Sequence, residues 1–436
     1  MTDIERRLRE AMLAAVDGEL PPADLVGRVL RMHRRYLARA VGAAVVGAVL
    51  LAAVPVAFAL RGADHGRPQP IASASSGSPA HSPSPSPRSS HPPRHAHSRP
   101  EPVWMRGLPL PPATDLRLLL AARDPAWFST ASGGITTIAG LPRSRYPYTF
   151  VRVRGGWDAR PSPKVPACTP DCPDPRMPVY LIADGSTVAR RVAVTQETAP
   201  GAGHVLLWLE TYPPGTTNAS TTRATAQPVS ASGQPAGAAV RLPTGYGIQQ
   251  QVGRYLLLSP DLQGPGPVIF KLWDPMTSRV VRTFPNIVAA SASQIAWSIC
   301  AGCAMHVLDV RTGRSKLIGV PSRTWPYDGL FSSGGRFLAV HLSGGVTANG
   351  YATLGRIAVI DLATRRLQVL VGSRVGTDAP AALIFGWRAG SDTLIAAVTT
   401  AHPSAQIGTW HPGAVRLRVR RISVPPGMTV VLGPYG

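Results

Sequence analysis

The sequence predicts an all-β protein: a β-propeller of about six, and between five and seven, four-stranded blades, preceded by one transmembrane helix and a linker. Three observations predict this. An uncharged apolar segment lies near the N-terminus, a strand–Asp-turn–strand unit recurs in the part of the chain after residue 113, and the composition favours turns over helices. Among 436 residues there are 43 glycines and 45 prolines, and only 16% of the residues are charged, which argues against a helix-dominated fold.

The apolar segment is residues 40–60, AVGAAVVGAVLLAAVPVAFAL, which contain no charged side chain. At about 1.5 Å per residue, a helix of this length spans the roughly 30 Å hydrocarbon core of a bilayer. We therefore expect a transmembrane helix that contacts membrane lipid through residues 40–60.

Flanking charge predicts the orientation of this helix. Basic side chains close to a membrane span stay in the cytoplasm. They are concentrated before the span, at Arg28, Arg31, Arg34, Arg35 and Arg39, and only Arg61 and Arg67 follow closely. We expect a single-pass plasma-membrane protein with a cytoplasmic N-terminus and an extracytoplasmic C-terminal domain. The alternative is a signal peptide cleaved after Ala59, within the A-x-A pattern of residues 57–59.

These features divide the chain into four parts. Residues 1–39 carry apolar side chains at helical spacing and are predicted to form a cytoplasmic helical tail. Its role is either to dock a partner or only to set the orientation. Residues 61–112 are rich in Pro, Ser and His, which predicts an extended linker. Residues 113–436 are predicted to form the extracytoplasmic propeller.

One turn recurs in that domain, in which an apolar strand ends in Asp and the following turn closes with Thr. An Asp side chain accepts hydrogen bonds from backbone N–H groups just ahead of it, and this favours a tight turn. Ser230 to Gly233 and His411 to Gly413 stand where further turns of the series are expected. The Asp and Thr pairs are Asp184 and Thr187, Asp274 and Thr277, Asp309 and Thr312, and Asp361 and Thr364.

A second element precedes these turns, a small or polar turn followed by a buried-type strand, as in GRYLLL at residues 253–258 and GRFLAV at 335–340. Together the two elements give a four-stranded unit with a period of about 45 residues, which is typical of propeller blades. Six such turns predict six blades. Residues 114–140 remain, either to close the last blade or to belong to a seventh.

The run SSGGRFLAV at residues 332–340 resembles the S-P-D-G-R-x-L-A-V run of WD40-like and TolB-like propeller blades, although Gly334 replaces the usual Asp. Trp273 and Asp274 resemble the WD dipeptide. Over residues 114–436 the chain is similar to this divergent propeller class. Its whole layout resembles membrane-anchored propeller proteins of high-GC Gram-positive bacteria. The resemblance implies a binding scaffold and assigns no chemistry.

The four cysteines form two close pairs, Cys168 with Cys172 and Cys300 with Cys303. Thiols outside the cytoplasm oxidise, so we expect two local disulfides. One zinc ion held by all four thiolates is the alternative, and a redox-active C-x-x-C is a third interpretation for the second pair. We expect no metal and no cofactor.

The formal net charge is +22, carried almost wholly by arginine. Alternation along residues 415–422 predicts that Arg416, Arg418 and Arg420 share one face of a strand. This stripe is a candidate site for an anionic wall polymer or lipid headgroup. The alternative is an outer strand whose charges block edge pairing. Nucleic acid is not an expected partner because the domain is exported.

The sequence lacks a G-x-S-x-G elbow, an H-E-x-x-H pair and a phosphate-binding G-x-x-x-x-G-K loop. We therefore expect no enzyme, no catalytic residue, and a non-catalytic binding or sensing scaffold for a protein, peptide or wall-polymer ligand. Two alternatives remain. One is a transmembrane regulator that acts through its cytoplasmic tail, as anti-sigma factors do, and the other is a propeller hydrolase or lyase.

Overall fold

The computed structural model describes residues 105–144, 147–161, 175–216, 219–260, 268–300, 302–322, 324–343, 356–370, 382–399 and 404–432. Within these ranges the chain forms β-strands and one 3-10 helix, η1 (Ala219–Thr221). No helix in them has the length and apolar character needed to cross a membrane. The predicted tail, transmembrane helix and most of the linker lie outside the described residues.

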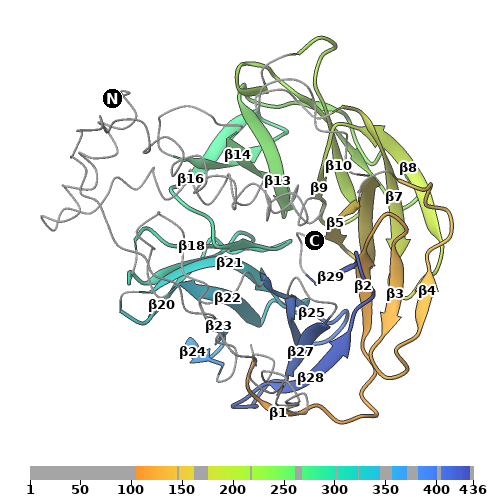
Figure 1. The fold of residues 1–436 in the computed structure, drawn as a ribbon. Coiled ribbons are helices and arrows are strands. Elements are labelled where there is room, and N and C mark those ends of the chain that lie inside the picture. Colours follow the sequence, from red (N-terminus) through yellow and green to blue (C-terminus); the bar gives the residue numbers. More distant parts are fainter. Residues whose placement is uncertain are drawn as a thin grey trace, which may run out of the picture. The chain divides into compact units, whose positions relative to one another are not determined.

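The strands form seven sheets, and each sheet is one blade with four strands in a meander (Figure 1). Numbered from the inner strand outward, the first three blades are blade 1, with β29 (Thr429–Val431), β2 (Arg117–Ala121), β3 (Ala126–Ser129) and β4 (Ile135–Thr137); blade 2, with β5 (Tyr148–Val153), β6 (Gly156–Pro161), β7 (Met177–Ala183) and β8 (Ala189–Thr195); and blade 3, with β9 (Glu197–Pro200), β10 (Leu207–Thr211), β11 (Thr225–Val229) and β12 (Val240–Arg241).

The remaining blades follow the same order. They are blade 4, with β13 (Tyr246–Val252), β14 (Tyr255–Pro260), β15 (Phe270–Asp274) and β16 (Arg279–Phe284); blade 5, with β17 (Ala289–Ala290), β18 (Gln294–Trp297), β19 (Met305–Asp309) and β20 (Ser315–Ile318); blade 6, with β21 (Trp325–Phe331), β22 (Phe337–Ser343), β23 (Arg356–Asp361) and β24 (Arg366–Val369); and blade 7, with β25 (Ala382–Trp387), β26 (Leu394–Thr399), β27 (Ser404–Trp410), β28 (Arg418–Ser423) and an added β1 (Leu108–Pro109).

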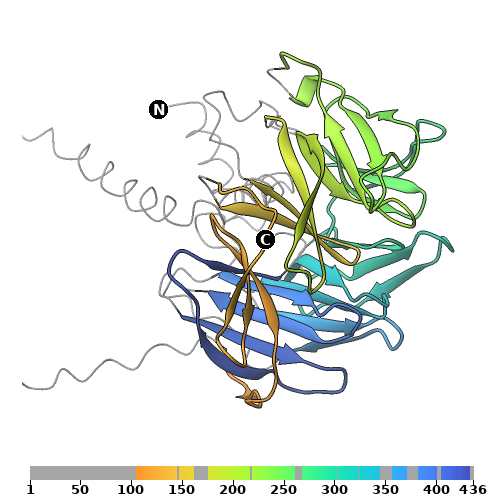
Figure 2. The same ribbon diagram turned by 90° about the vertical axis from the view of Figure 1, so that its right-hand side faces the viewer.

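The propeller prediction is therefore confirmed, with seven blades where the turn count alone gave six. Residues 114–140, which the repeat left unassigned, contain three strands of blade 1. The fourth strand, β29, comes from the C-terminal end of the chain and pairs antiparallel with β2. Figure 2 shows the first blade, in orange, beside the last blade, in blue. The ring is thus closed by strands from both ends of the described chain.

The four main strands of each blade are antiparallel to their neighbours, so successive connections alternate between its two ends; only the added β1 pairs parallel, with β28. The connections between strands one and two, and between three and four, lie at one end, which we call the turn end. The connections between strands two and three, and from blade to blade, lie at the other, which we call the loop end. All four predicted Asp turns join strands three and four, and therefore lie at the turn end.

Local hydrogen bonds account for three of these turns. The Asp309 carboxylate accepts the backbone N–H groups of Arg311 and Thr312, both at 3.0 Å. Asp361 accepts those of Ala363 and Thr364, at 2.9 and 3.4 Å, and Asp274 accepts that of Met276. Asp184 instead binds the Arg152 guanidinium through both oxygens, at 2.5 and 2.7 Å.

The two recurring sequence elements meet in space at the turn end. Arg336, of the GRFLAV element, contacts Asp361 at 3.1 Å and lies over the Phe337 ring, 4.9 Å from its centroid. Arg254, of the GRYLLL element, contacts Asp274 at 3.7 Å and lies over Tyr255. In blades 4 and 6 the repeat therefore places an arginine between a turn carboxylate and an aromatic ring. Both neighbours attract the positive charge of the guanidinium.

The hydrophobic cores lie between adjacent blades. One cluster joins Phe337 and Ile357 of blade 6 to Phe385 and Trp410 of blade 7. Met105, only 1% exposed, inserts into the same cluster, and its backbone N–H donates to the Gln406 side chain at 2.6 Å. Residues 105–112, which the sequence assigned to the linker, thus include a buried side chain and the strand β1 on the outer edge of blade 7.

Candidate functional site

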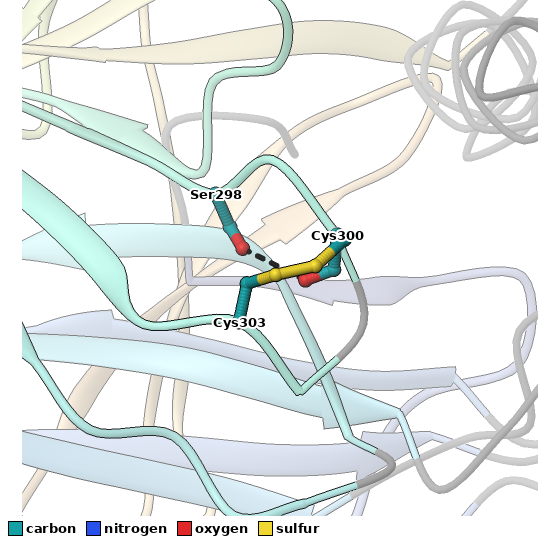
Figure 3. Close-up of a disulfide and its surroundings, with 3 residues drawn as sticks. All are labelled: Ser298, Cys300 and Cys303. Carbon is teal, nitrogen blue, oxygen red and sulfur yellow. Dashed lines mark hydrogen bonds between the residues drawn. A yellow bond between two sulfur atoms is a disulfide. The ribbon is translucent and has the colours of Figure 1, made fainter.

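The second cysteine pair forms a disulfide, Cys300–Cys303, in the connection between β18 and β19 at the loop end of blade 5 (Figure 3). The buried Ser298 hydroxyl donates to the Cys300 carbonyl at 3.1 Å. Gly302 donates its backbone N–H to the Thr324 carbonyl in the connection to blade 6. The disulfide therefore closes a small loop within one connection, and the Gly302 hydrogen bond joins that loop to the next connection. Cys168 and Cys172 lie outside the described residues.

The predicted arginine stripe divides into two parts. Arg416 and Arg418 are exposed. The Arg420 guanidinium instead donates to the backbone carbonyls of Thr130 at 3.1 Å, Thr114 at 3.3 Å and Leu110 at 3.5 Å, and to that of Pro111. These carbonyls belong to blade 1 and to the segment leading into it. Arg420 therefore joins blade 7 to blade 1.

A different group of polar side chains gathers between blades 2 and 3. Asp158 and Arg160 lie two residues apart on β6, so both side chains leave the strand on the same side. Asp158 is fully buried, and its Oδ2 accepts a hydrogen bond from the Thr198 hydroxyl on β9. Arg160 lies 3.7 Å from this carboxylate and 3.7 Å from the carboxylate of Glu197, the first residue of β9.

Exposure rises stepwise through this group. The Asp158 side chain is 0% exposed, Arg160 15% and Glu197 39%. Glu210, 2% exposed, lies directly opposite Glu197 in the β9–β10 pairing and accepts the Ile248 backbone N–H of blade 4 at 2.8 Å. We call Asp158, Arg160, Glu197 and Thr198 the acidic cluster, and Glu210 lies beside it with its side chain bound to blade 4. The cluster runs from the interior to solvent near the loop end, with two carboxyl groups and one guanidinium.

Burial dominates the electrostatics of Asp158. Desolvation raises the pKa of this carboxyl above its ordinary value, while the Arg160 charge and the Thr198 hydrogen bond lower it. No donor among the described residues reaches its Oδ1 atom. A buried acceptor with no hydrogen bond is costly, and strongly perturbed carboxyls are concentrated at functional sites.

A second buried titratable group lies between blades 6 and 7. His341 on β22 stacks on Tyr327, with ring centroids 5.1 Å apart, and packs on Phe385 at 4.7 Å. Burial lowers its pKa to about 4, against a smaller opposite effect of the Asp328 charge. A neutral imidazole held between aromatic rings is a packing arrangement.

No sequence motif groups the residues of this cluster, and none of them was a candidate site residue from the sequence. The spacing of Asp158 and Arg160 is the only local signal. Thr198 and Glu197 reach the site from the next blade, so no motif within one segment records the contact.

No protein-family model and no curated protein matches the chain. Among solved structures, it is similar to a prolyl endopeptidase chain, with 13% identity and a TM-score of 0.46, over 74% of this chain and 50% of that one. It is also similar to a protein from Lactobacillus plantarum, with 12% identity and a TM-score of 0.41, over 72% of this chain and all of that one. The chain therefore spans about half the length of the endopeptidase.

The endopeptidase match overturns the expectation that the chain is not an enzyme, and we withdraw that expectation. The expectation rested on the absence of local motifs. Polar side chains can converge from strands far apart in the sequence, as Asp158 and Glu197 do on Arg160, so that absence was insufficient. At this identity and TM-score the likeness assigns no reaction and no residue to this chain.

Proposed function

We propose that this protein is a membrane-anchored, extracytoplasmic propeller that binds a peptide or protein segment carrying a positive charge, at the loop end between blades 2 and 3. The acidic cluster is the observation that supports this. In a chain of net charge +22, it places the carboxyl groups of Asp158 and Glu197 beside one guanidinium, and its outermost member, Glu197, is 39% exposed.

The geometry suggests how such a ligand binds. Glu197 presents a carboxylate to solvent, and an ammonium or guanidinium group forms strong charge-assisted hydrogen bonds with a carboxylate. Arg160 contacts Glu197 and Asp158 at 3.7 Å, beyond the usual hydrogen-bond distance. An incoming cation therefore competes with a loose ion pair on the exposed side of the cluster. Asp158 and Thr198, which are joined by a hydrogen bond, form the buried side of the cluster.

The test is ligand-dependent stabilisation of the full chain in detergent or nanodiscs. A lysine-containing tripeptide and its glutamate counterpart are compared by thermal unfolding of the wild type, Glu197→Gln and Asp124→Asn. Asp124 is the matched control, because it is an exposed acid at the loop end of blade 1. A ligand at 100 times its dissociation constant stabilises a protein by about 2.7 kcal/mol.

We expect the lysine peptide to raise the midpoint of the wild type and of Asp124→Asn, and to leave that of Glu197→Gln unchanged. An equal shift in all three proteins, or an equal effect of the glutamate peptide, contradicts the assignment of the site.

A further inference from the structure

The turn end of the propeller is strongly basic. Every blade except blade 3 contributes exposed arginines to it, from the connections themselves or from the adjoining strand ends. The aspartates at this end are fewer, and Asp274 and Asp361 already pair with arginines of the same blade. The arginines are Arg117, Arg154, Arg190, Arg191, Arg254, Arg279, Arg311, Arg314, Arg336, Arg365, Arg366, Arg388, Arg416 and Arg418.

Apolar side chains stand among these arginines. Met276 is 86% exposed, Val415 69% and Val188 59%, which are the highest values among the exposed large hydrophobic residues of the described chain. Each lies in a connection between strands three and four, in blades 4, 7 and 2 respectively. Met276 follows the Asp274 turn, whose carboxylate accepts the Met276 backbone N–H. The turn geometry therefore holds this side chain out from the blade.

From these two features we propose that the turn end docks on an anionic phospholipid surface. Basic side chains near such a surface are attracted to its phosphates, and exposed apolar tips enter the boundary between headgroups and acyl chains. The arginines are spread over six blades, which suits an extended charged plane better than the single line of one polymer strand. The docking surface lies opposite the acidic cluster, so a propeller that lies on lipid leaves its ligand site facing outward.

This inference goes beyond the proposed function and uses the proposed anchor only to keep the propeller near a bilayer. The test uses the full chain in nanodiscs of phosphatidylcholine alone, or of phosphatidylcholine with one quarter phosphatidylglycerol. Hydrogen exchange of the peptides covering the connections between strands three and four is the readout. Incorporation into the phosphatidylcholine discs at high salt tests the anchor separately.

We expect these connections to be protected from exchange in the phosphatidylglycerol discs and not in the neutral discs, and the protection to be lost at 0.5 M salt because the charges are screened. The variant Arg311→Glu/Arg314→Glu removes two basic residues from blade 5. Each arginine near an anionic surface changes the ratio of docked to free propeller about fivefold, so the double variant loses at least about 25-fold. Met276→Ser weakens docking without any change in charge.

The matched control is Arg176→Glu/Arg356→Glu, which makes the same charge change at the loop end, where both arginines are exposed. It should dock like the wild type. Equal protection in both lipids, or equal loss in the control, overturns the proposal. Protection that appears only with a soluble polyphosphate added to neutral discs also overturns it, and assigns the basic end to a soluble polyanion instead.

Discussion

Replacing Arg420 by methionine should loosen the junction between the first and last blades. Arg420 lies on β28, the fourth strand of blade 7, and its guanidinium donates to carbonyl oxygens of Thr114 and Thr130 in and beside blade 1, and of Leu110 and Pro111 in the segment before it. Methionine keeps an unbranched apolar stem of similar length and removes every one of these donors. The change therefore tests the hydrogen bonds with little loss of packing.

The structure allows an estimate of the cost. The bonds to Thr130 and Thr114, at 3.1 and 3.3 Å, have ordinary N–H···O lengths. A hydrogen bond to a charged group contributes about 1.5–3 kcal/mol. Losing two such bonds should lower the free energy of unfolding by roughly 3 kcal/mol, because water that reaches the freed carbonyl groups offsets part of the loss. With an unfolding entropy of about 2.1 cal/mol/K per residue and about 330 residues, this lowers the midpoint by about 4 °C.

The assay is calorimetric or fluorescence-detected thermal unfolding of the full chain, with Arg418→Met as the control. Arg418 is on the same strand, two residues away and exposed, so its replacement should shift the midpoint by less than 1 °C, as is usual for surface positions. Hydrogen exchange should show the added opening in β2 and β29 before other strands. Equal midpoints for the two variants would refute the role assigned to Arg420. So would hydrogen exchange that becomes faster only in strands other than β2 and β29.

Four further outcomes are expected. Gly386→Ala should destabilise the propeller strongly, because the new Cβ would collide with the Leu432 carbonyl oxygen beside β29. The control is Gly390→Asp, at an open position with positive φ, which costs backbone strain without a collision. Thermal midpoints compare the two, and a smaller loss for Gly386→Ala than for Gly390→Asp would contradict the close packing at Gly386. His341→Phe should make the free energy of unfolding depend less on pH between 6.5 and 4. The wild type loses about 3 kcal/mol as the pH falls from 6.5 to 4, because only the unfolded histidine takes up the proton, and denaturant midpoints across this range measure it. Asp158→Asn should gain stability relative to the wild type as the pH rises above 4, because the raised pKa disfavours the buried charge; a constant difference between pH 3.5 and 7 would refute this cause. Reduction of Cys300–Cys303 should cost about 2 kcal/mol on the loop-entropy model for so short a loop. Unfolding with and without reductant checks it, with Cys300→Ser/Cys303→Ser as the control, because any response that this variant keeps comes from Cys168 and Cys172.

The repeat could be predicted because its determinants are local. Asp309 and Asp361 bind N–H groups two and three residues ahead of them, so the hairpin is encoded within one short segment. The turn count omitted blade 1, whose residues 114–140 the sequence left open between closing the last blade and belonging to a seventh, because its turn is encoded differently. There Asp115, which precedes β2, accepts the Ser129 hydroxyl and the Ala131 N–H in the turn after β3. The acceptor and the turn are separated in the sequence, so no Asp appears where the pattern requires one.

The acidic cluster lay beyond sequence reasoning for a related reason. Asp158 meets Thr198, and Arg160 meets Glu197, only because blade 2 packs against blade 3. The packing of one blade on the next depends on complementary apolar surfaces, and these do not specify which polar groups become neighbours. Arg420 is a second example of a contact that no single segment encodes. Its alternation with Leu417 and Val419 predicted that it lies in a stripe of solvent-exposed arginines. Its carbonyl partners come from the opposite end of the chain.

The closing strand β29 has a consequence for the order of biogenesis. Thr429–Val431 is translated after every other strand of the described propeller, yet it completes the sheet whose other three strands are translated first among the blade strands. Until β29 has been made, β2 lacks its inner neighbour, and its backbone donors and acceptors have no strand to pair with on that side. A product that stops before β29 has every other blade but an open seam, and that seam is a surface by which a quality-control protease or a chaperone could distinguish unfinished propellers from finished ones.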